Sequence, residues 1–225
     1  MIGNLEEIDP NDVAAIFYQP NDDVDRLLAD FAQDLARRGV RVGGIVQRHF
    51  KGANGTHAMC AVDVATGQEI SISKPLDSGT MSCTLDTNGL AEAAIVVSQA
   101  LHDKVDLLVI SKFGKQEAAG RGLRAEFIDA ITSGVPLLTA VPRKCLVDWR
   151  AFTGDVGTLL VCDRQVVEEW WRDSSTRLAR SPAFSPSCSY LATIIPDSLM
   201  TAVRLPGTLA PKAPAGLPGR LRKTP

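Results

Sequence analysis

A short apolar run that breaks into a loop rich in glycine and cations constrains the fold of this chain more than any other feature. Residues 105–110 read VDLLVI, without the polar and apolar alternation of a half-exposed strand. Such a run is typical of a strand buried on both faces of a parallel sheet. The following loop carries Lys112, Lys115 and Arg121 among three glycines, and a helical pattern begins at Leu123. In open parallel sheets ligands bind at this end of a strand, so the loop is expected to be either a ligand site or a structural turn.

The rest of the chain alternates strands with helices. Further parallel strands are expected at residues 13–18, 40–46, 135–141 and 158–161, and helices at 24–35, 87–101, 123–131 and 164–172. Residues 57–64 and 68–73 are predicted to form an inserted β-hairpin around Ala65-Thr66-Gly67, whereas residues 74–86 lack any period and are expected to be a loop. This order predicts an α/β fold of three layers, with a mostly parallel sheet and an inserted β-hairpin.

The charge distribution divides the chain in two. Residues 176–225 hold seven Lys or Arg, one acid and eight of the 13 prolines. We therefore predict an α/β domain at residues 12–173 and a basic, proline-rich, disordered tail at 174–225. A basic tail can contact nucleic acid or an acidic surface, but a solvated extension is the simpler expectation, and nucleic acid is not the partner that we expect.

Several classes of protein are not indicated by the sequence. No apolar run is long enough to cross a membrane, and the acidic start of the chain lacks the apolar core of a signal peptide, so a cytoplasmic protein is expected. The five cysteines are scattered without a C-x-x-C pair, and His49 and His57 have no partner ligands at metal spacing. Neither a disulfide framework nor a metal site is predicted.

The loop after the first strand lacks the parts of a P-loop. A P-loop needs glycines to surround phosphates, a lysine that reaches them and a hydroxyl for magnesium, whereas this chain has Asp22, Asp23 and Asp25. P-loop enzymes also carry a metal-binding acid after the central strand, where this chain has Ser111 and Lys112. Ordinary P-loop hydrolysis is therefore not expected.

The cationic loop is the candidate anion site. Cations at the start of a helix oppose the helix dipole, which favours a functional reason for Arg121 and Arg124 over a solvated helix start. The candidate residues provide charge, close backbone approach or neutral polar contacts: Lys112, Gly114, Lys115, Gln116, Gly120, Arg121, Gly122, Arg124, Gln47, Ser82 and Cys83.

Several of these residues carry a resemblance. Gln47, the CTLD segment at 83–86 and above all SKFGKQE at 111–117 with GRGLR at 120–124 resemble a bacterial family of unknown function. Its members are commonly encoded beside molybdate-transport genes and are sometimes labelled molybdenum ABC transporter proteins. The resemblance covers about residues 12–173. More distantly, the order of elements is similar to small P-loop nucleoside triphosphatases with an inserted hairpin, which implies the fold but not the activity.

Three functions are open at this point. The first is a cytosolic, non-catalytic protein that binds an oxyanion such as molybdate, or a nucleotide, on a degenerate P-loop-like fold, in molybdenum uptake or homeostasis. The second is a nucleotide hydrolase or phosphotransferase with a rebuilt site, in which Glu117 positions water and Lys112 steadies the transferred group. The third is an interaction or assembly protein in molybdenum handling, with proteins of molybdate transport or cofactor assembly as partners.

Overall fold

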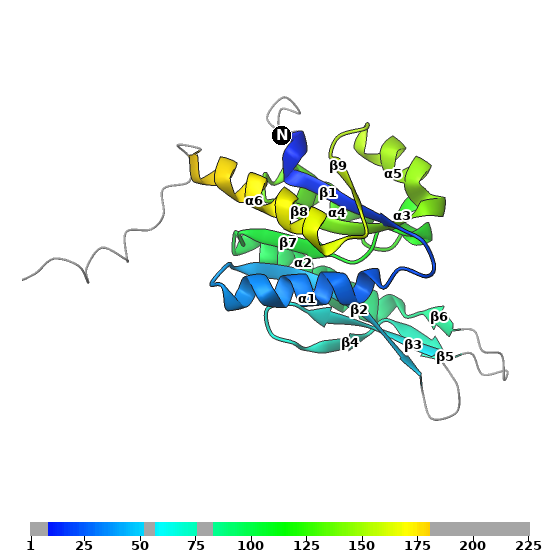
Figure 1. The fold of residues 1–225 in the computed structure, drawn as a ribbon. Helices are drawn as coiled ribbons and strands as arrows, with labels where there is room; N and C mark the ends of the chain where they lie inside the picture. Colours follow the sequence, from blue (N-terminus) through cyan, green and yellow to red (C-terminus); the bar gives the residue numbers. More distant parts are fainter. Residues whose placement is uncertain (1–8, 52–56, 76–82, 181–225) are drawn as a thin grey trace, which may run out of the picture. The chain divides into compact units, whose positions relative to one another are not determined.

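The computed structural model describes residues 9–51, 57–75 and 83–180, which form a mixed sheet covered by helices on both faces (Figure 1). Within these residues the main sheet has seven strands in the order β4-β3-β2-β7-β8-β1-β9. Neighbours from β2 to β9 pair in parallel, β3 is antiparallel to β2, and β4 is antiparallel to β3. The strands are β1 (Val13–Tyr18), β2 (Val42–Lys51), β3 (His57–Asp63), β4 (Glu69–Ser71), β7 (Leu107–Ile110), β8 (Leu137–Pro142) and β9 (Thr158–Val161). The predicted α/β class with an inserted hairpin is confirmed.

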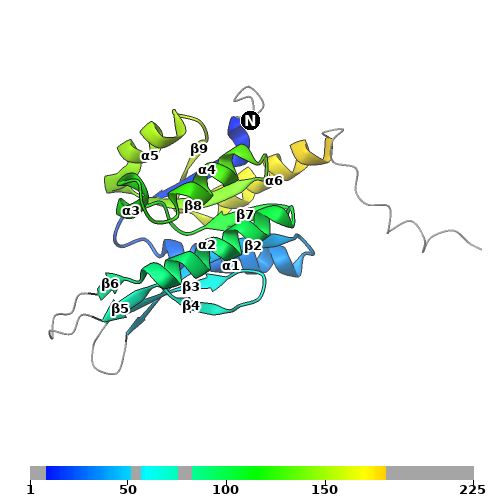
Figure 2. The same ribbon diagram turned by 180° about the vertical axis from the view of Figure 1, so that it is seen from behind.

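The helices lie in two layers. Figure 1 shows α1 and α6 over one face of the sheet, and Figure 2 shows α2, α4 and α5 over the other. The helices are α1 (Val24–Arg37), α2 (Thr87–His102), α3 (Lys115–Ala118), α4 (Arg124–Thr132), α5 (Leu146–Thr153) and α6 (Arg164–Arg180), with short 3-10 turns η2 (Pro10–Asp12) and η3 (Arg143–Cys145). No helix among the described residues is both long and apolar enough to span a membrane.

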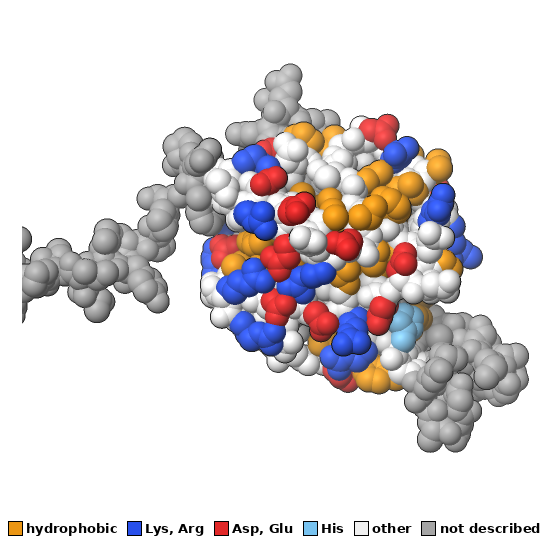
Figure 3. Space-filling view, viewed as in Figure 1, with side chains coloured by type: hydrophobic (Ala, Val, Ile, Leu, Met, Phe, Trp, Pro, Cys, Tyr) orange, Lys and Arg blue, Asp and Glu red, His pale blue; other side chains and the backbone are white. Residues whose placement is uncertain are grey.

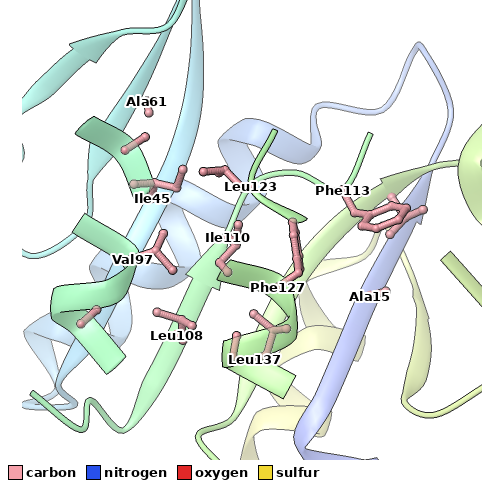
Figure 4. Packing of buried hydrophobic residues seen from close by; sticks show 14 of the residues in the cluster. Ala15, Ile45, Ala61, Val97, Leu108, Ile110, Phe113, Leu123, Phe127 and Leu137 are labelled. Carbon is pink, nitrogen blue, oxygen red and sulfur yellow. The ribbon is translucent and has the colours of Figure 1, made fainter. Parts of the chain in front are cut away.

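The central strand β7 explains the apolar run in the sequence. Leu108 and Ile110 pack in one hydrophobic cluster, beside Val97 of α2 and Phe127 of α4 (Figure 4). Leu107 and Val109 face the opposite cluster, which lies beneath α1 and α6. All four side chains of β7 are fully buried. A strand that is covered on both faces needs apolar residues at every position, so no alternation is visible.

Two of the predicted boundaries in the hairpin region were wrong. β2 does not end at residue 46 but continues to Lys51, because β3 pairs with it antiparallel from Ile45–Asp63 to Lys51–His57. Residues 74–86 are not entirely a loop, since β5 (Ser73–Pro75) and β6 (Cys83–Leu85) pair antiparallel in a small second sheet. Asp86 caps α2, with its carboxylate accepting the backbone N–H of Asn88.

The end of the domain differs from the prediction as well. The stretch around Trp149, for which no helix was predicted, forms the helix α5, and Trp149 is buried against Phe113 with ring centroids 5.1 Å apart. α6 extends to Arg180, eight residues beyond the predicted end at 172, so residues 174–180 continue a helix. The tail predicted from residue 174 otherwise lies outside the described residues, and the division into domain and tail stays a prediction.

Candidate anion-binding site

The loop that follows β7 is folded around the carboxylate of Glu117, which is 7% exposed. One oxygen, Oε2, accepts the backbone N–H of Gly114 at 2.8 Å, and Oε1 accepts that of Leu123 at 3.0 Å. Arg124 donates from its guanidinium to the Glu117 carbonyl at 2.9 Å. Since both carboxylate oxygens already accept backbone N–H groups, the geometry favours a structural role for Glu117 over the positioning of a water molecule.

The contact with Glu117 also explains one glycine of the loop. Gly122 has a φ of +62°, and a Cβ there would lie 2.1 Å from Glu117 Oε1. Gly120 has a φ of +81° with nothing within 4 Å of its would-be Cβ. Both positions require a left-handed backbone, which glycine adopts without strain. Gly122 is therefore needed by the loop itself, whether or not an anion approaches its backbone.

Lys112 is paired with an acid from the first helix. Its Nζ lies 2.9 Å from Oδ1 of Asp25, and Ser111 donates its hydroxyl to the same oxygen at 3.2 Å. His49 Nε2 lies 3.3 Å from Asp25 Oδ2. Burial alone would raise the pKa of the Asp25 carboxyl, but its contacts with His49 and Lys112 outweigh burial and hold that pKa below its usual value. The charge of Lys112, which the sequence presented as available to an anion, is balanced within the protein.

Tyr18 lies on the other side of this ion pair. Lys112 Nζ is 5.3 Å from the centroid of the Tyr18 ring, a cation–π geometry. Burial, with a further contribution from the charge of Asp25, raises the pKa of Tyr18 to about 12. The hydroxyl of Tyr18 is therefore protonated at every physiological pH.

A cavity of about 270 Å³ lies where β7 ends, beside the middle of β2 and beside α2 and α3. Five of the predicted site residues line it: Gln47, Lys112, Gly114, Lys115 and Gln116. Its walls are largely apolar, with Ile45, Met59 and Leu90 among the residues that line it. The structure therefore places the exposed Lys115, the paired Lys112 and two amide side chains in the lining of a mostly apolar cavity.

The remaining predicted residues lie elsewhere. Arg121 is exposed and donates from Nε to Gln116 Oε1 at 3.0 Å, while the guanidinium of Arg124 lies over the Phe152 ring at 4.4 Å. Neither arginine is among the described residues that line the cavity, nor are Gly120 and Gly122. Ser82 lies outside the described residues, and of Cys83 the structure describes the backbone, as the first residue of β6.

The sequence analysis missed two cations at the same edge of the sheet. Arg143 and Lys144 follow β8 directly and are exposed. Figure 3 shows Lys and Arg side chains at the right-hand edge of the molecule, where Figure 1 places α3 and α5. The available signal was their place directly after Pro142, since they follow a buried strand just as Lys112 does.

Two further cavities accompany these cations. One of about 540 Å³ is lined by Tyr18, Gln19, Pro20, Pro142, Arg143 and Lys144. Another of about 380 Å³ is lined by Lys115 and Lys144 together with Ala118, Ala119, Cys145 and Asp148. Lys115 thus borders the first and third cavities, and Lys144 borders the second and third. The carboxyl edge of the sheet carries a series of neighbouring cavities lined by cations.

Comparisons with known proteins place this site in a wider context. A family described as "Protein of unknown function (DUF2478)" matches residues 13–170. A protein of Bradyrhizobium diazoefficiens, named "Molybdenum import ATP-binding protein ModC 2", is 60% identical over 178 residues, which are 79% of this chain and 20% of that protein. The chain thus spans about a fifth of that relative's length.

A solved structure supports the fold. The solution structure of a human cancer-related nucleoside triphosphatase matches with a TM-score of 0.52 and 16% sequence identity, over 75% of this chain and 98% of that chain. At this identity the likeness concerns the fold alone, and it agrees with the distant resemblance to nucleoside triphosphatases seen in the order of elements.

Proposed function

The chain belongs to the DUF2478 family of proteins of unknown function, and from this starting point we propose that it is a non-catalytic binding protein for a small anion. The ligand is an oxyanion such as molybdate, or a nucleotide, held at the carboxyl edge of a degenerate P-loop-like fold. The observation that carries this proposal is the cavity where β7 ends, which is lined by the exposed Lys115, by Gln47 and Gln116, and by Lys112 in its pair with Asp25. Ligands of open parallel sheets bind at this edge.

The pairing of Lys112 with Asp25 supports binding without turnover. In P-loop enzymes the loop after the first strand contributes a lysine to the phosphates, and the central strand contributes an acid to magnesium. In this chain the helix after β1 contributes an acid, Asp25. The segment after β7 contributes a cation, Lys112, whose Nζ lies 2.9 Å from Oδ1 of Asp25. A magnesium-bound triphosphate would therefore meet a charge of the wrong sign at both places.

The relative's name supports a role in molybdenum handling. Its 60% identity over 178 residues includes the region of the site. We infer that anion binding by this chain serves molybdenum import or homeostasis in the cytoplasm, and that proteins of molybdate transport are its partners. This part of the proposal rests on a relative of which the chain covers a fifth.

Thermal unfolding of the full chain tests the proposal. The chain is heated alone and with millimolar molybdate, tungstate, sulfate or Mg-ATP, since a ligand that binds the native state raises its stability by RT ln(1 + [L]/Kd). At a concentration of 100 Kd this is about 2.7 kcal/mol, or a rise in Tm of roughly 5–11 °C for a chain of this size. A shift with molybdate and tungstate but not with sulfate identifies the oxyanion, and a shift with ATP that Lys115→Glu removes identifies the nucleotide as the ligand of this cavity.

A pair of charge reversals locates the binding. Lys115→Glu is expected to abolish the shift, because Lys115 lines the cavity and is exposed. Lys104→Glu is the matched control, because Lys104 is exposed at the start of the segment that leads into β7, at the opposite edge of the sheet. Equal ligand shifts in the two variants, or no shift with any of the four ligands, would contradict the binding proposal. Release of phosphate from Mg-ATP by the purified chain would contradict its non-catalytic part.

A further inference from the structure

The cavity of about 540 Å³ at the ends of β1 and β8 is separate from the site just proposed. β1 and β8 are paired neighbours in the sheet, and the residues that follow both strands line this cavity. It shares no described lining residue with the cavity where β7 ends. Its volume is within the range of roughly 300–1,000 Å³ that is usual for small-molecule sites, and it is larger than a tetrahedral oxyanion needs.

The walls of this cavity suit a flat ring. Tyr18, Pro20 and Pro142 are among the residues that line it. Aromatic faces and proline rings pack well against flat heterocycles, and stacking of this kind tolerates many ring types. The position of Tyr18 is held by Lys112, whose Nζ lies 5.3 Å from the ring centroid. Because Tyr18 is protonated at physiological pH, its hydroxyl is also a hydrogen-bond donor.

The cations of the cavity suit a phosphate. Arg143 and Lys144 are exposed, and in the described part of the chain no carboxylate pairs with either of them. Both stand immediately before α5, where the partial positive charge of the helix start makes a cation unfavourable. An arginine fork beside a lysine is a common arrangement for binding phosphate oxygens. A bound phosphate would offset this unfavourable concentration of positive charge.

We propose that this cavity binds a phosphorylated aromatic heterocycle, with the nucleoside monophosphates as the simplest members of the class. The ring lies against Tyr18 and the two prolines, and the phosphate lies at Arg143 and Lys144. The neighbouring cavity of about 380 Å³ shares Lys144 with this one and is also lined by Lys115, so it offers space to a longer phosphate chain. This site is independent of the anion site at β7, and either site can exist without the other.

Isothermal titration calorimetry of the full chain tests this proposal. The probes are AMP, GMP, ribose 5-phosphate and inorganic phosphate. At least one of the two nucleotides is expected to bind at least tenfold more tightly than ribose 5-phosphate or phosphate, because only the nucleotides carry a ring to stack. The double variant Arg143→Ser/Lys144→Ser should weaken nucleotide binding by on the order of tenfold or more, since two charge-assisted contacts are lost.

Two controls separate this site from the site at β7. Lys104→Ser/Arg172→Ser removes two exposed cations outside the cavities and should leave nucleotide affinity unchanged. Lys115→Glu, which alters the β7 site, should retain nucleotide binding to within a few-fold. Circular dichroism and Tm confirm that each variant is folded, which is expected because the replaced side chains are exposed.

Three results would overturn the proposal. The first is the absence of AMP and GMP binding at millimolar concentration, and the second is phosphate binding as tight as that of both nucleotides. The third is nucleotide binding that survives in Arg143→Ser/Lys144→Ser. If that binding is instead lost in Lys115→Glu, the nucleotide occupies the β7 site, so the function proposed above stands while the present inference fails.

Discussion

Removal of the Asp25 charge should make this protein less stable and a better binder of anions at the same time. The carboxylate of Asp25 faces Lys112 at 2.9 Å, and both side chains are 18% exposed. Asp25→Asn keeps the shape and one oxygen acceptor for the Ser111 hydroxyl, while the negative charge disappears. Lys112 is then left as an unbalanced cation in the lining of the cavity.

The two effects can be estimated separately. A hydrogen bond to a charged group contributes about 1.5–3 kcal/mol, so a loss near 2 kcal/mol is expected, with a fall in Tm of roughly 4–8 °C. An anion in contact with Lys112 Nζ would lie about 6 Å from the Asp25 carboxylate. With an effective dielectric constant of about 20–40, the repulsion that Asp25→Asn removes is about 1.4–2.8 kcal/mol, or a ten- to hundredfold gain in anion affinity.

The measurement is the affinity of wild-type and variant chains for molybdate and for ATP, by calorimetry, together with their Tm. Asp30→Asn is the matched control, because Asp30 lies on the same helix and its side chain is 58% exposed in a pair with Arg26. This control should change neither quantity appreciably. A folded Asp25→Asn variant that binds both anions no better than Asp30→Asn would refute the inference that Asp25 masks Lys112.

The stability effect also has a defined pH dependence. Because the pKa of Asp25 is lowered in the folded chain, its stabilising contribution is complete above the ordinary aspartate pKa of about 3.9. It is lost as the pH falls through the lowered value. The stability difference between wild type and Asp25→Asn should therefore shrink below about pH 4. A difference that instead disappears on raising the pH from 5 to 7 would show that this carboxylate is not its source.

Three further predictions concern close contacts, two in the loop after β7 and one between α2 and β4. Glu117→Gln should lower the urea midpoint by the equivalent of about 1–3 kcal/mol, because one of two backbone N–H groups, the buried one of Leu123 or the half-buried one of Gly114, loses its acceptor. An unchanged midpoint would contradict this structural role. Gly122→Ala should cost more than Gly120→Ala, because both strain a left-handed backbone but a Cβ at Gly122 would also lie 2.1 Å from Glu117 Oε1; equal losses in parallel urea titrations would exclude that contact. Gly89→Ala should lower Tm although alanine favours helices, because the new Cβ would lie 1.9 Å from the Ser71 carbonyl oxygen. A rise in Tm would show that α2 is not so closely packed against Ser71.

The strands were the most predictable part of the fold. β1 and β9 have the predicted bounds, residues 13–18 and 158–161. Strands of a sheet covered on both faces must be apolar at each position, so they are visible in a single sequence. α5 was not visible, because its eight residues, LVDWRAFT, are too few for a clear helical period and follow soon after Pro142. The pairing of β5 with β6 depends on a contact between segments without any hydrophobic pattern.

The site was predictable in its location but not in its electrostatics. The position of Lys112 after a buried strand places it at the carboxyl edge of the sheet, and the cavity there contains it. Its partner Asp25 lies 87 residues earlier, and no local pattern connects the two. In the sequence, Asp25 was interpreted only as an acid in the place of a phosphate-binding loop, whereas its carboxylate contacts the cation Lys112. Arg143 and Lys144 follow β8, a strand whose residues gave no sign of a ligand-binding loop after it.

The hydrogen bonds of Glu117 to the backbone of the loop after β7 affect how the sequence of that loop can vary among related proteins. The carboxylate of Glu117 accepts hydrogen bonds from the backbone N–H groups of Gly114 and Leu123. These hydrogen bonds do not depend on the exposed side chains between the two residues. Mutations at Lys115 or Arg121 can therefore accumulate while the path of the loop is conserved. Substitutions in this segment can therefore change which ligand it binds while its backbone conformation is retained. This holds for natural variants and for engineered ones.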